Sequence, residues 1–342
     1  MAGAEIKGGG MRVVITGGAG FIGKRLARQI LDRGHLTDAA GVEQPIASVT
    51  LFDIVEATGF DDDPRVTTVS GDIADRAQVA SVLGTDADSI FHLAAIVSAH
   101  AEEDYDLGMR INLDGTRNVI EAARGMATPP KVVFASSVAV YGGTGLPDTV
   151  TDETPITPQT SYGVAKACGE QLLNDASRKG FLDARCLRLP TISVRTGKPN
   201  RAASTWASSM IREPLCGVDM DVPVSPESAM ALMSPRRVVD AFITAHEVAA
   251  ERLGDWRTLL LSGFTATAGE MQAAVLRNRG NRKLGAINFR PDPKTQAIVD
   301  GWPSGTSGAR AEALGIHTDA SIDEIVRHFI EDDLDDQIQG RF

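Results

Sequence analysis

Short apolar runs alternate with amphipathic segments along the chain as far as Pro190. Short runs rich in aliphatic residues are typical of buried strands, and apolar positions three or four residues apart are typical of helices. The strand-like runs are 12–16, 48–54, 65–73, 89–95, 131–137 and 184–190. The helical patterns between them are 21–34, 76–83, 107–123 and 161–173. Strands that alternate with helices predict βαβ units, and therefore an α/β fold with a doubly wound parallel sheet.

The pattern changes after Pro190, where strand alternation weakens. Helical patterns there cover 203–211, 235–249, 269–277 and 321–330, with loop-like sequence between them. We therefore expect a core domain over residues 11–190 and a smaller, mostly helical C-terminal substrate lobe over 191–342 that is interleaved with the core. Residues 1–10, "MAGAEIKGGG", are interpreted as an N-terminal extension.

The composition narrows the classes of partner. The chain has 342 residues, a formal net charge of -11 and no Lys/Arg-rich run, which argues against nucleic-acid and anionic-membrane surfaces. No apolar run approaches the roughly 20 residues that cross a bilayer, so we expect a cytoplasmic protein without a membrane contact. Cys168, Cys186 and Cys216 form no CxxC pair and the histidines show no HxH or HxxxH spacing, so neither a disulfide framework nor a metal site is expected. His92, on a strand, is interpreted as structural.

A glycine cluster, "TGGAGFIG", separates the first strand from the first helix. Gly17, Gly20 and Gly23 permit a tight turn, and the N-terminus of the following helix offers free N–H donors and a partial positive charge to an anion. This arrangement binds a dinucleotide pyrophosphate in a Rossmann-type sheet. A plain strand-to-helix turn is the alternative interpretation, and the position after the first strand favours the dinucleotide.

Acidic residues follow the next two strands. Asp53, at the end of its strand, can accept hydrogen bonds from the adenosine ribose and would repel a 2′-phosphate, which favours NAD over NADP as the cofactor. Its separation from the glycines is longer than usual, and the polar stretch 36–47 accounts for this. Asp72, in "GDI", is placed to meet the adenine amine. Either side chain can instead cap a turn.

Tyr162 and Lys166 lie four residues apart, and therefore on one face of the predicted helix. An ammonium beside a phenol lowers the pKa of the phenol, so that Tyr162 can act as a general base near neutral pH. Lys166 can also bind the nicotinamide ribose. Ser137, at the C-terminal end of a strand, can hold a substrate hydroxyl and stabilise charge on its oxygen. Alternatively, Tyr162 packs, Lys166 is solvated and Ser137 caps a turn; the order of the motifs along the chain favours catalysis.

These motifs resemble those of a known family. "TGGAGFIG", "HLAA", "NLDGTRNVI", "FASSVAVYG" and "SYGVAK" are similar to the extended short-chain dehydrogenase/reductases, the NAD-dependent epimerase/dehydratase group, over residues 11–190. The resemblance implies that Tyr162 is the catalytic acid/base and that Lys166 is its partner and a ribose ligand. It also implies that Ser137 orients the substrate hydroxyl.

The family pattern around the serine limits which reactions of the family are expected. Ser137 is preferred to Ser136 because it stands four residues before Tyr141, as in the family's SxxxYG pattern. Dehydratases of the family read "STDEVYG", with carboxylates after the serine or threonine, whereas this chain has Val138 and Ala139. Dehydration is not expected, because elimination needs those proton-transfer groups. Dehydrogenation and epimerisation remain as the candidate reactions.

The resemblance implies further contacts with NAD. Asn112 corresponds to the asparagine that supports the active-site geometry, although it can simply satisfy backbone groups. Thr191 is placed to meet the nicotinamide amide. The cofactor-binding residues implied are Gly17, Gly20, Phe21, Ile22, Gly23, Asp53, Asp72, Ile73, Leu93, Ala94, Ala95, Asn112, Tyr162, Lys166 and Thr191.

The segment after the last strand of the core indicates the substrate. "LRLPTISVRTGKPNRAASTWASSMIREPLCG" resembles the D-erythronate dehydrogenases of this family, which oxidise the C2 hydroxyl of a four-carbon sugar acid with NAD. Arg195 and Arg201 are candidates for a bidentate contact with the substrate carboxylate, although each can be a solvated loop cation. Asn200 and Ser98 are further candidates for substrate contacts.

These expectations combine into one reaction. Tyr162 takes the C2 hydroxyl proton while hydride moves to NAD, and the product is a 2-oxo acid. One alternative is a nucleotide-sugar epimerase with tightly held NAD, and another is a nucleotide-sensing protein without catalysis. The family favours a homodimer formed through the helices that bear "NLDGTRNVI" and "SYGVAK".

Overall fold

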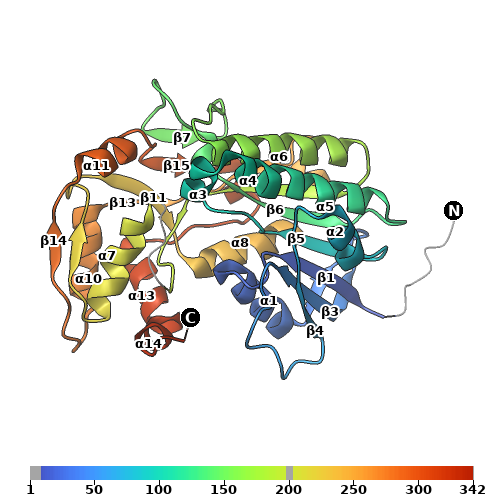
Figure 1. Cartoon of the computed structure of the whole chain (residues 1–342), viewed down its shortest axis with the longest axis horizontal. Helices are drawn as coiled ribbons and strands as arrows, with labels where there is room; N and C mark the ends of the chain where they lie inside the picture. The colour runs from blue at the N-terminus through green and yellow to red at the C-terminus, as the bar shows by residue number, and fades with distance from the viewer. Residues whose placement is uncertain (1–8, 198–202, 342) are drawn as a thin grey trace.

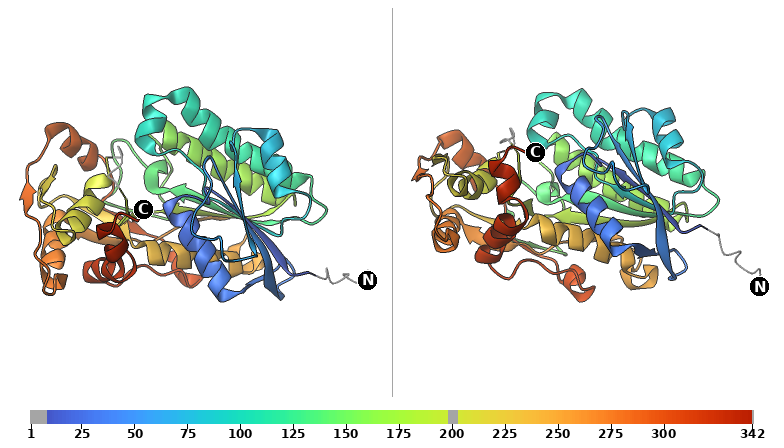
Figure 2. Two further views of the ribbon diagram at one scale, coloured as in Figure 1. Left: turned by 60° about the horizontal axis from the view of Figure 1, so that its bottom comes forward. Right: turned by 90° about the horizontal axis from the view of Figure 1, so that it is seen from below.

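The computed structural model describes residues 9–197 and 203–341. The chain forms an α/β core and a smaller lobe (Figure 1). Figure 2 shows the lobe beside the core in two further views. Within the described residues no helix is both long and apolar enough to cross a membrane.

The core is built on an eight-stranded sheet. Its strands are β1 (Met11–Thr16), β2 (His35–Thr37), β3 (Glu43–Asp53), β4 (Val66–Ser70), β5 (Ser89–His92), β6 (Lys131–Ser137), β8 (Asp183–Leu189) and β12 (Thr258–Leu260). Their order is β12-β8-β6-β5-β1-β3-β2, with β4 also paired to β3. All neighbours are parallel except β2 and β3. The order reverses at β1, and ligands bind at such a point beyond the carboxyl ends of the strands. The predicted doubly wound sheet is confirmed.

Helices cover both faces of this sheet, as Figure 1 shows. One apolar cluster joins the sheet to α1 (Phe21–Arg33) and α8 (Pro235–Glu247). A second cluster joins the opposite face to α2 (Arg76–Leu83), α5 (Gly115–Arg124) and α6 (Ser161–Arg178). Both α8 and β12 come from sequence beyond residue 190, so the C-terminal part of the chain returns to the core. The division into domains at that residue stays a prediction.

The lobe has its own apolar core, to which α7 (Thr205–Leu215), α10 (Ala268–Asn278) and α13 (Ile322–Asp332) contribute. Small sheets flank these helices. They comprise β9 (Thr191–Ile192), β11 (Ala229–Met233) and β13 (Phe264–Thr267) in one sheet, and β10 (Met220–Val222) with β14 (Ile287–Phe289) in another. The sequence pattern missed these strands, because two to five residues carry little alternation.

Other short elements complete the core and the lobe. They are α3 (Ser98–Glu103), α4 (Tyr105–Met109), β7 (Thr149–Thr151), α9 (Ala250–Leu253), α11 (Pro293–Asp300), β15 (Gly305–Ser307), α12 (Ala309–Ala313) and α14 (Leu334–Ile338). The lobe strand β15 pairs in parallel with the core strand β7. The lobe is therefore fastened to the core by backbone hydrogen bonds near the end of the sheet where ligands are expected.

Two segments show local structure that the sequence pattern did not predict. The polar stretch 36–47 is a β-hairpin of β2 and β3, whose turn is held by Asp38 accepting hydrogen bonds from the backbone of Ala40 and Val42. The helix expected over 107–123 is interrupted by a π-helical turn, η1 (Arg110–Asp114). Such turns often mark functional segments, and this one contains the predicted Asn112.

Candidate active site

The glycine turn packs too closely for side chains. Gly17 has a φ of +73°, and a Cβ there would lie 2.8 Å from the backbone nitrogen of Ala94. A Cβ on Gly23 would lie 2.2 Å from the carbonyl oxygen of Gly17. The N-terminus of α1 follows at Phe21 and has neither a side-chain cap nor an acidic residue in its first turn. Free N–H groups and the helix dipole therefore fit a dinucleotide pyrophosphate.

Two predicted carboxylates lie near this turn. Asp53 ends β3 and accepts hydrogen bonds from the backbone N–H groups of Ala19, at 3.1 Å, and Ile54, at 2.7 Å. Asp72 follows β4 and accepts a hydrogen bond from Arg110 at 2.7 Å. Burial raises the pKa of Asp72, but the hydrogen bonds from Ala74 and Arg110 outweigh it and lower the pKa overall. Asp53 is thus held against the glycine turn, and Asp72 is held against Arg110.

Some predicted cofactor residues have side chains that face the apolar core or bind the protein backbone. Ile73 belongs to the apolar cluster beneath α5, so its side chain faces the core. Asn112 accepts a hydrogen bond from Ile96 N at 2.9 Å and donates one to Ile96 O at 3.2 Å. These bonds let Asn112 support the loop after β5, and its contact with NAD stays a prediction. That loop contains Leu93, Ala94 and Ala95, and Ala94 packs on Gly17.

His92 is structural, as predicted. Its Nδ1 lies 2.7 Å from Thr16 Oγ1 and its Nε2 lies 3.0 Å from Thr116 Oγ1. Burial lowers the pKa of His92 to about 3, so the ring is neutral. It ties β1, β5 and the helix after η1 together.

The structure brings together the three predicted catalytic side chains. Ser137 ends β6, and its hydroxyl forms a hydrogen bond with Tyr162. Lys166 Nζ lies 5.6 Å from the centre of the Tyr162 ring. The helix α6 begins behind a Thr160 cap, and Gly163 lets it approach the turn after Ser137, because a Cβ there would lie 2.1 Å from Ala139 O. The glycine that follows Tyr162 therefore lets the helix bring the phenol against Ser137.

The prediction that Lys166 lowers the pKa of Tyr162 is wrong. Burial raises the pKa of Tyr162, and the hydrogen bond with Ser137 and the charge of Arg195 only partly offset it. Lys166 instead donates a hydrogen bond to Ala135 O at 2.7 Å and lies over the Phe134 ring. Burial also lowers the pKa of Lys166 to about 8. The sequence spacing correctly placed the two groups on one face of the helix, but desolvation has the largest effect on the pKa of the phenol.

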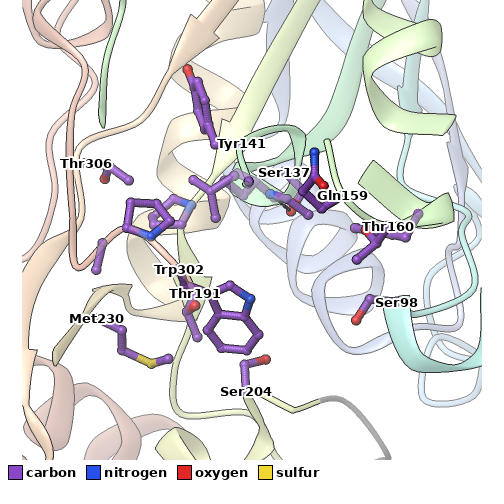
Figure 3. A pocket seen from close by; sticks show the side chains of 18 of the residues that line it. Ser98, Ser137, Tyr141, Gln159, Thr160, Thr191, Ser204, Met230, Trp302 and Thr306 are labelled. Carbon is purple, nitrogen blue, oxygen red and sulfur yellow. Dashed lines mark hydrogen bonds between the residues drawn. The ribbon is translucent and has the colours of Figure 1, made fainter. Parts of the chain in front are cut away.

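A cavity of about 480 Å³ opens beside this trio, between the core and the lobe (Figure 3). Of the predicted residues, its lining includes Ser98, Ser137, Tyr162, Thr191 and Arg195. Ser98 is the first residue of α3 and reaches the cavity after a loop, instead of directly from a strand. Sequence reasoning missed further lining residues: Gln159, Ser204, Met230, Ile298, Trp302 and Thr306. Most belong to lobe segments without a recognisable motif, so only the fold reveals them.

Arg195 is the cationic side chain that faces Tyr162 across the described part of this cavity. Its Nη2 donates a hydrogen bond to Ser204 Oγ at 3.0 Å, and no described carboxylate pairs with it. Burial and the charge of Arg212 lower the pKa of Arg195, and the phenol of Tyr162 opposes this. A partly buried guanidinium without an acidic partner is suited to a substrate anion. The other candidates, Asn200 and Arg201, lie outside the described residues.

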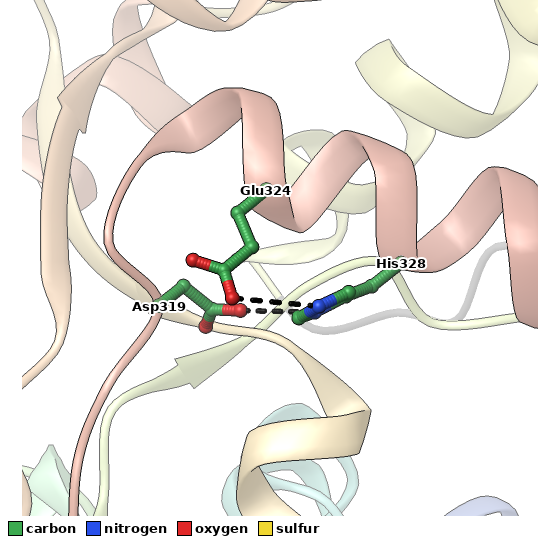
Figure 4. Close-up of side chains that lie close together, drawn as sticks. All are labelled: Asp319, Glu324 and His328. Carbon is green, nitrogen blue, oxygen red and sulfur yellow. Dashed lines mark ion pairs between the residues drawn. The ribbon is translucent and has the colours of Figure 1, made fainter.

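Three groups of metal-ligand type also meet in the lobe, at Asp319, Glu324 and His328 (Figure 4). His328 Nδ1 lies 3.1 Å from Asp319 Oδ1, and His328 Nε2 lies 3.5 Å from Glu324 Oε1. These residues contain only one histidine and therefore show no HxH or HxxxH spacing in the sequence. Arg237, on α8, donates to Glu324 at 2.8 Å and already supplies a positive charge. The cluster joins α13 to α8.

Comparison with known sequences places the chain among enzymes. The family model described as the NAD dependent epimerase/dehydratase family matches residues 13–253. The chain is 49% identical to a D-erythronate dehydrogenase of Cupriavidus necator, over 94% of this chain and 98% of that one. It is 41% identical to a D-erythronate dehydrogenase of Haemophilus influenzae, over 95% and 100% of the two chains.

Solved structures show the same architecture. One from Agrobacterium tumefaciens, described as a nucleoside-diphosphate-sugar epimerase, has a TM-score of 0.89 and 37% identity over 99% of both chains. The GalE-like L-threonine dehydrogenase of Cupriavidus necator has a TM-score of 0.79 over 94% of this chain and 99% of that one, and at 24% identity it shows the fold alone. Given the glycine turn, the Ser-Tyr-Lys trio and a family model that spans most of the sequence, the chain belongs to the NAD-dependent epimerase/dehydratase family.

Proposed function

We propose that this protein is an NAD-dependent dehydrogenase that oxidises the C2 hydroxyl of D-erythronate to 2-oxo-tetronate. The observation that carries the proposal is its similarity, along nearly the whole chain, to two relatives named D-erythronate dehydrogenase. The cavity supports it, because the guanidinium of Arg195 faces the phenol of Tyr162. That pairing suits a substrate with a carboxylate next to the reacting hydroxyl.

Each side chain has a defined task in this mechanism. Arg195 binds the C1 carboxylate and so fixes C2 beside Tyr162. Ser137 hydrogen-bonds the C2 oxygen, and the phenolate of Tyr162 accepts the C2 hydroxyl proton. Lys166 keeps Ala135 as one partner and has N–H groups left for the cofactor ribose. Bound NAD would supply the hydride acceptor, and loss of hydride from C2 together with the hydroxyl proton taken by Tyr162 would leave a carbonyl in the product.

The proposal is tested by following NADH absorbance with NAD and a panel of three- to six-carbon sugar acids, against UDP-sugars. Formation of NADH with D-erythronate supports the dehydrogenase. The name of the Agrobacterium structure favours a second candidate, epimerisation of a nucleotide sugar. NAD that copurifies with the protein, conversion of a UDP-sugar and no NADH from any sugar acid would establish that candidate instead.

Replacing Arg195 by Met is expected to raise the KM for D-erythronate by about 10- to 100-fold, because a charge-assisted pair with the carboxylate is lost. Steady-state kinetics measure this, and the KM for NAD serves as the internal control. Arg195→Lys keeps the charge but not the bidentate fork, so its KM for D-erythronate should lie between those of wild type and Arg195→Met. An unchanged KM for the acid in Arg195→Met would contradict the role.

We also propose that Asp53 selects NAD over NADP. Asp53→Asn keeps an acceptor for the N–H of Ala19 but removes the charge that repels a 2′-phosphate. The ratio of kcat/KM for NAD to that for NADP should fall about tenfold. Asp72→Asn is the matched control, because Asp72 would face the adenine that both cofactors share. Equal ratios in wild type and Asp53→Asn would refute the assignment.

The assembly and the location are part of the proposal. We propose a cytoplasmic homodimer that forms through α5 and α6. Exposed apolar side chains on α6, Val164 and Leu172, support an interface there. Mass measurement in solution checks the dimer.

A further inference from the structure

Trp302 forms the lobe-side wall of the cavity. It follows α11 and precedes β15, and Figure 3 shows its indole pointing into the cavity. The side chain is still 36% exposed, although an indole is one of the most apolar groups a chain can offer. Ile298 and Met230 belong to the same lining. These three side chains are apolar except for the indole N–H, whereas Ser137 and Tyr162 offer hydroxyls to the cavity.

The segment that carries Trp302 is held on both sides. After it, β15 pairs with β7 of the core, Gly305 N donates to Asp148 O at 2.9 Å, and a Cβ on Gly305 would lie 2.6 Å from Thr149 Oγ1. Before it, on α11, Gln296 accepts a hydrogen bond from Ser225 N at 2.8 Å and donates one to Ser228 Oγ at 2.9 Å. The chain is thus held in place on both sides of Trp302, at the boundary of the cavity.

We propose that Trp302 sets the chain length of the acid that the enzyme oxidises, an inference that rests on the proposed function. With the carboxylate at Arg195 and C2 at Tyr162, further carbons of the substrate extend toward the wall of Trp302, Met230 and Ile298. An acid with one or two more CHOH groups must press hydroxyls against Trp302, Met230 and Ile298, which offer the indole N–H and no other strong hydrogen-bonding group. Burying an unpaired hydroxyl is costly, so longer acids are rejected.

Selectivity is the measurement that tests this inference. In Trp302→Ala, the kcat/KM for five- and six-carbon aldonic acids, relative to D-erythronate, should rise about tenfold or more, because space and water become available. Trp302→Leu keeps an apolar wall of smaller size and should give a smaller rise; it also serves if the alanine variant folds poorly. Trp256→Ala removes an equally exposed tryptophan outside the cavity lining and should leave the ratio unchanged.

Fluorescence gives an independent readout, since the chain has only three tryptophans. Addition of D-erythronate without NAD, so that no NADH forms, should change the emission of wild type and Trp256→Phe, and the change should be lost in Trp302→Phe. If wild type forms NADH from D-erythronate but the selectivity ratio of Trp302→Ala equals that of wild type, the inference about Trp302 fails alone. If wild type oxidises no sugar acid, the proposed function fails, and this inference with it.

Discussion

Replacing Tyr162 by Phe is expected to lower kcat for D-erythronate oxidation by about 10³-fold. The ring and its packing stay, but the group that accepts the C2 hydroxyl proton is lost. NAD binding should change little, because the glycine turn and Asp53 lie on other elements. Steady-state kinetics and NAD titration separate the two effects. Tyr105→Phe, on an exposed tyrosine of α4, is the control and should leave kcat unchanged.

The pH profile provides a second test of Tyr162. Only the phenolate can accept a proton, and burial raises the pKa of this phenol. The fraction of phenolate therefore grows as pH rises above neutral, and the rate of oxidation by wild type should increase with it. Trp302→Leu should keep this dependence, and Tyr162→Phe should lose it. A residual rate in Tyr162→Phe with the same pH dependence as wild type would assign the base to another group.

Replacing Glu170 by Ala is expected to lower the free energy of unfolding by about 3–5 kcal/mol, because it leaves a buried guanidinium unpaired. Glu170 is fully buried on α6 and accepts hydrogen bonds from Arg188 Nε, at 3.0 Å, and Arg188 Nη2, at 2.7 Å. Arg188 also donates to Tyr141 at 2.8 Å, and Ser136 donates to Glu170. The network joins β6, β8 and α6 directly behind the catalytic side chains.

Urea or thermal unfolding measures the loss. Asp175→Ala, which removes an exposed partner of Arg178 on the same helix, is the matched control and should change stability by about 0.5 kcal/mol or less. Glu170→Met combined with Arg188→Met should recover much of the loss, because no buried charge is then unpaired. A Glu170→Ala protein as stable as the Asp175→Ala control would show that the pair contributes nothing.

Several parts of the site could be predicted from the residues. The spacing of Tyr162 and Lys166 places them on one helix face whatever surrounds the helix. Ser137 meets them because the carboxyl ends of parallel strands lie at one edge of the sheet. Glu170 stands four residues beyond Lys166, a signal that was present but was not used. Trp302 carried no such signal, since it reaches the cavity through the pairing of β15 with β7, which are far apart in sequence.

The sequence by itself determined the main strands and helices of the core, the glycine turn and the position of the Ser-Tyr-Lys trio. These depend on local periodicity and on the geometry that any parallel sheet imposes. Only the tertiary structure decided that Arg195 and Trp302 face one cavity, that Asn112 supports a loop, and that burial raises the pKa of Tyr162. Contacts between distant segments and the desolvation of a charge depend on the packed surroundings of a group, and neighbours along the chain do not specify those surroundings.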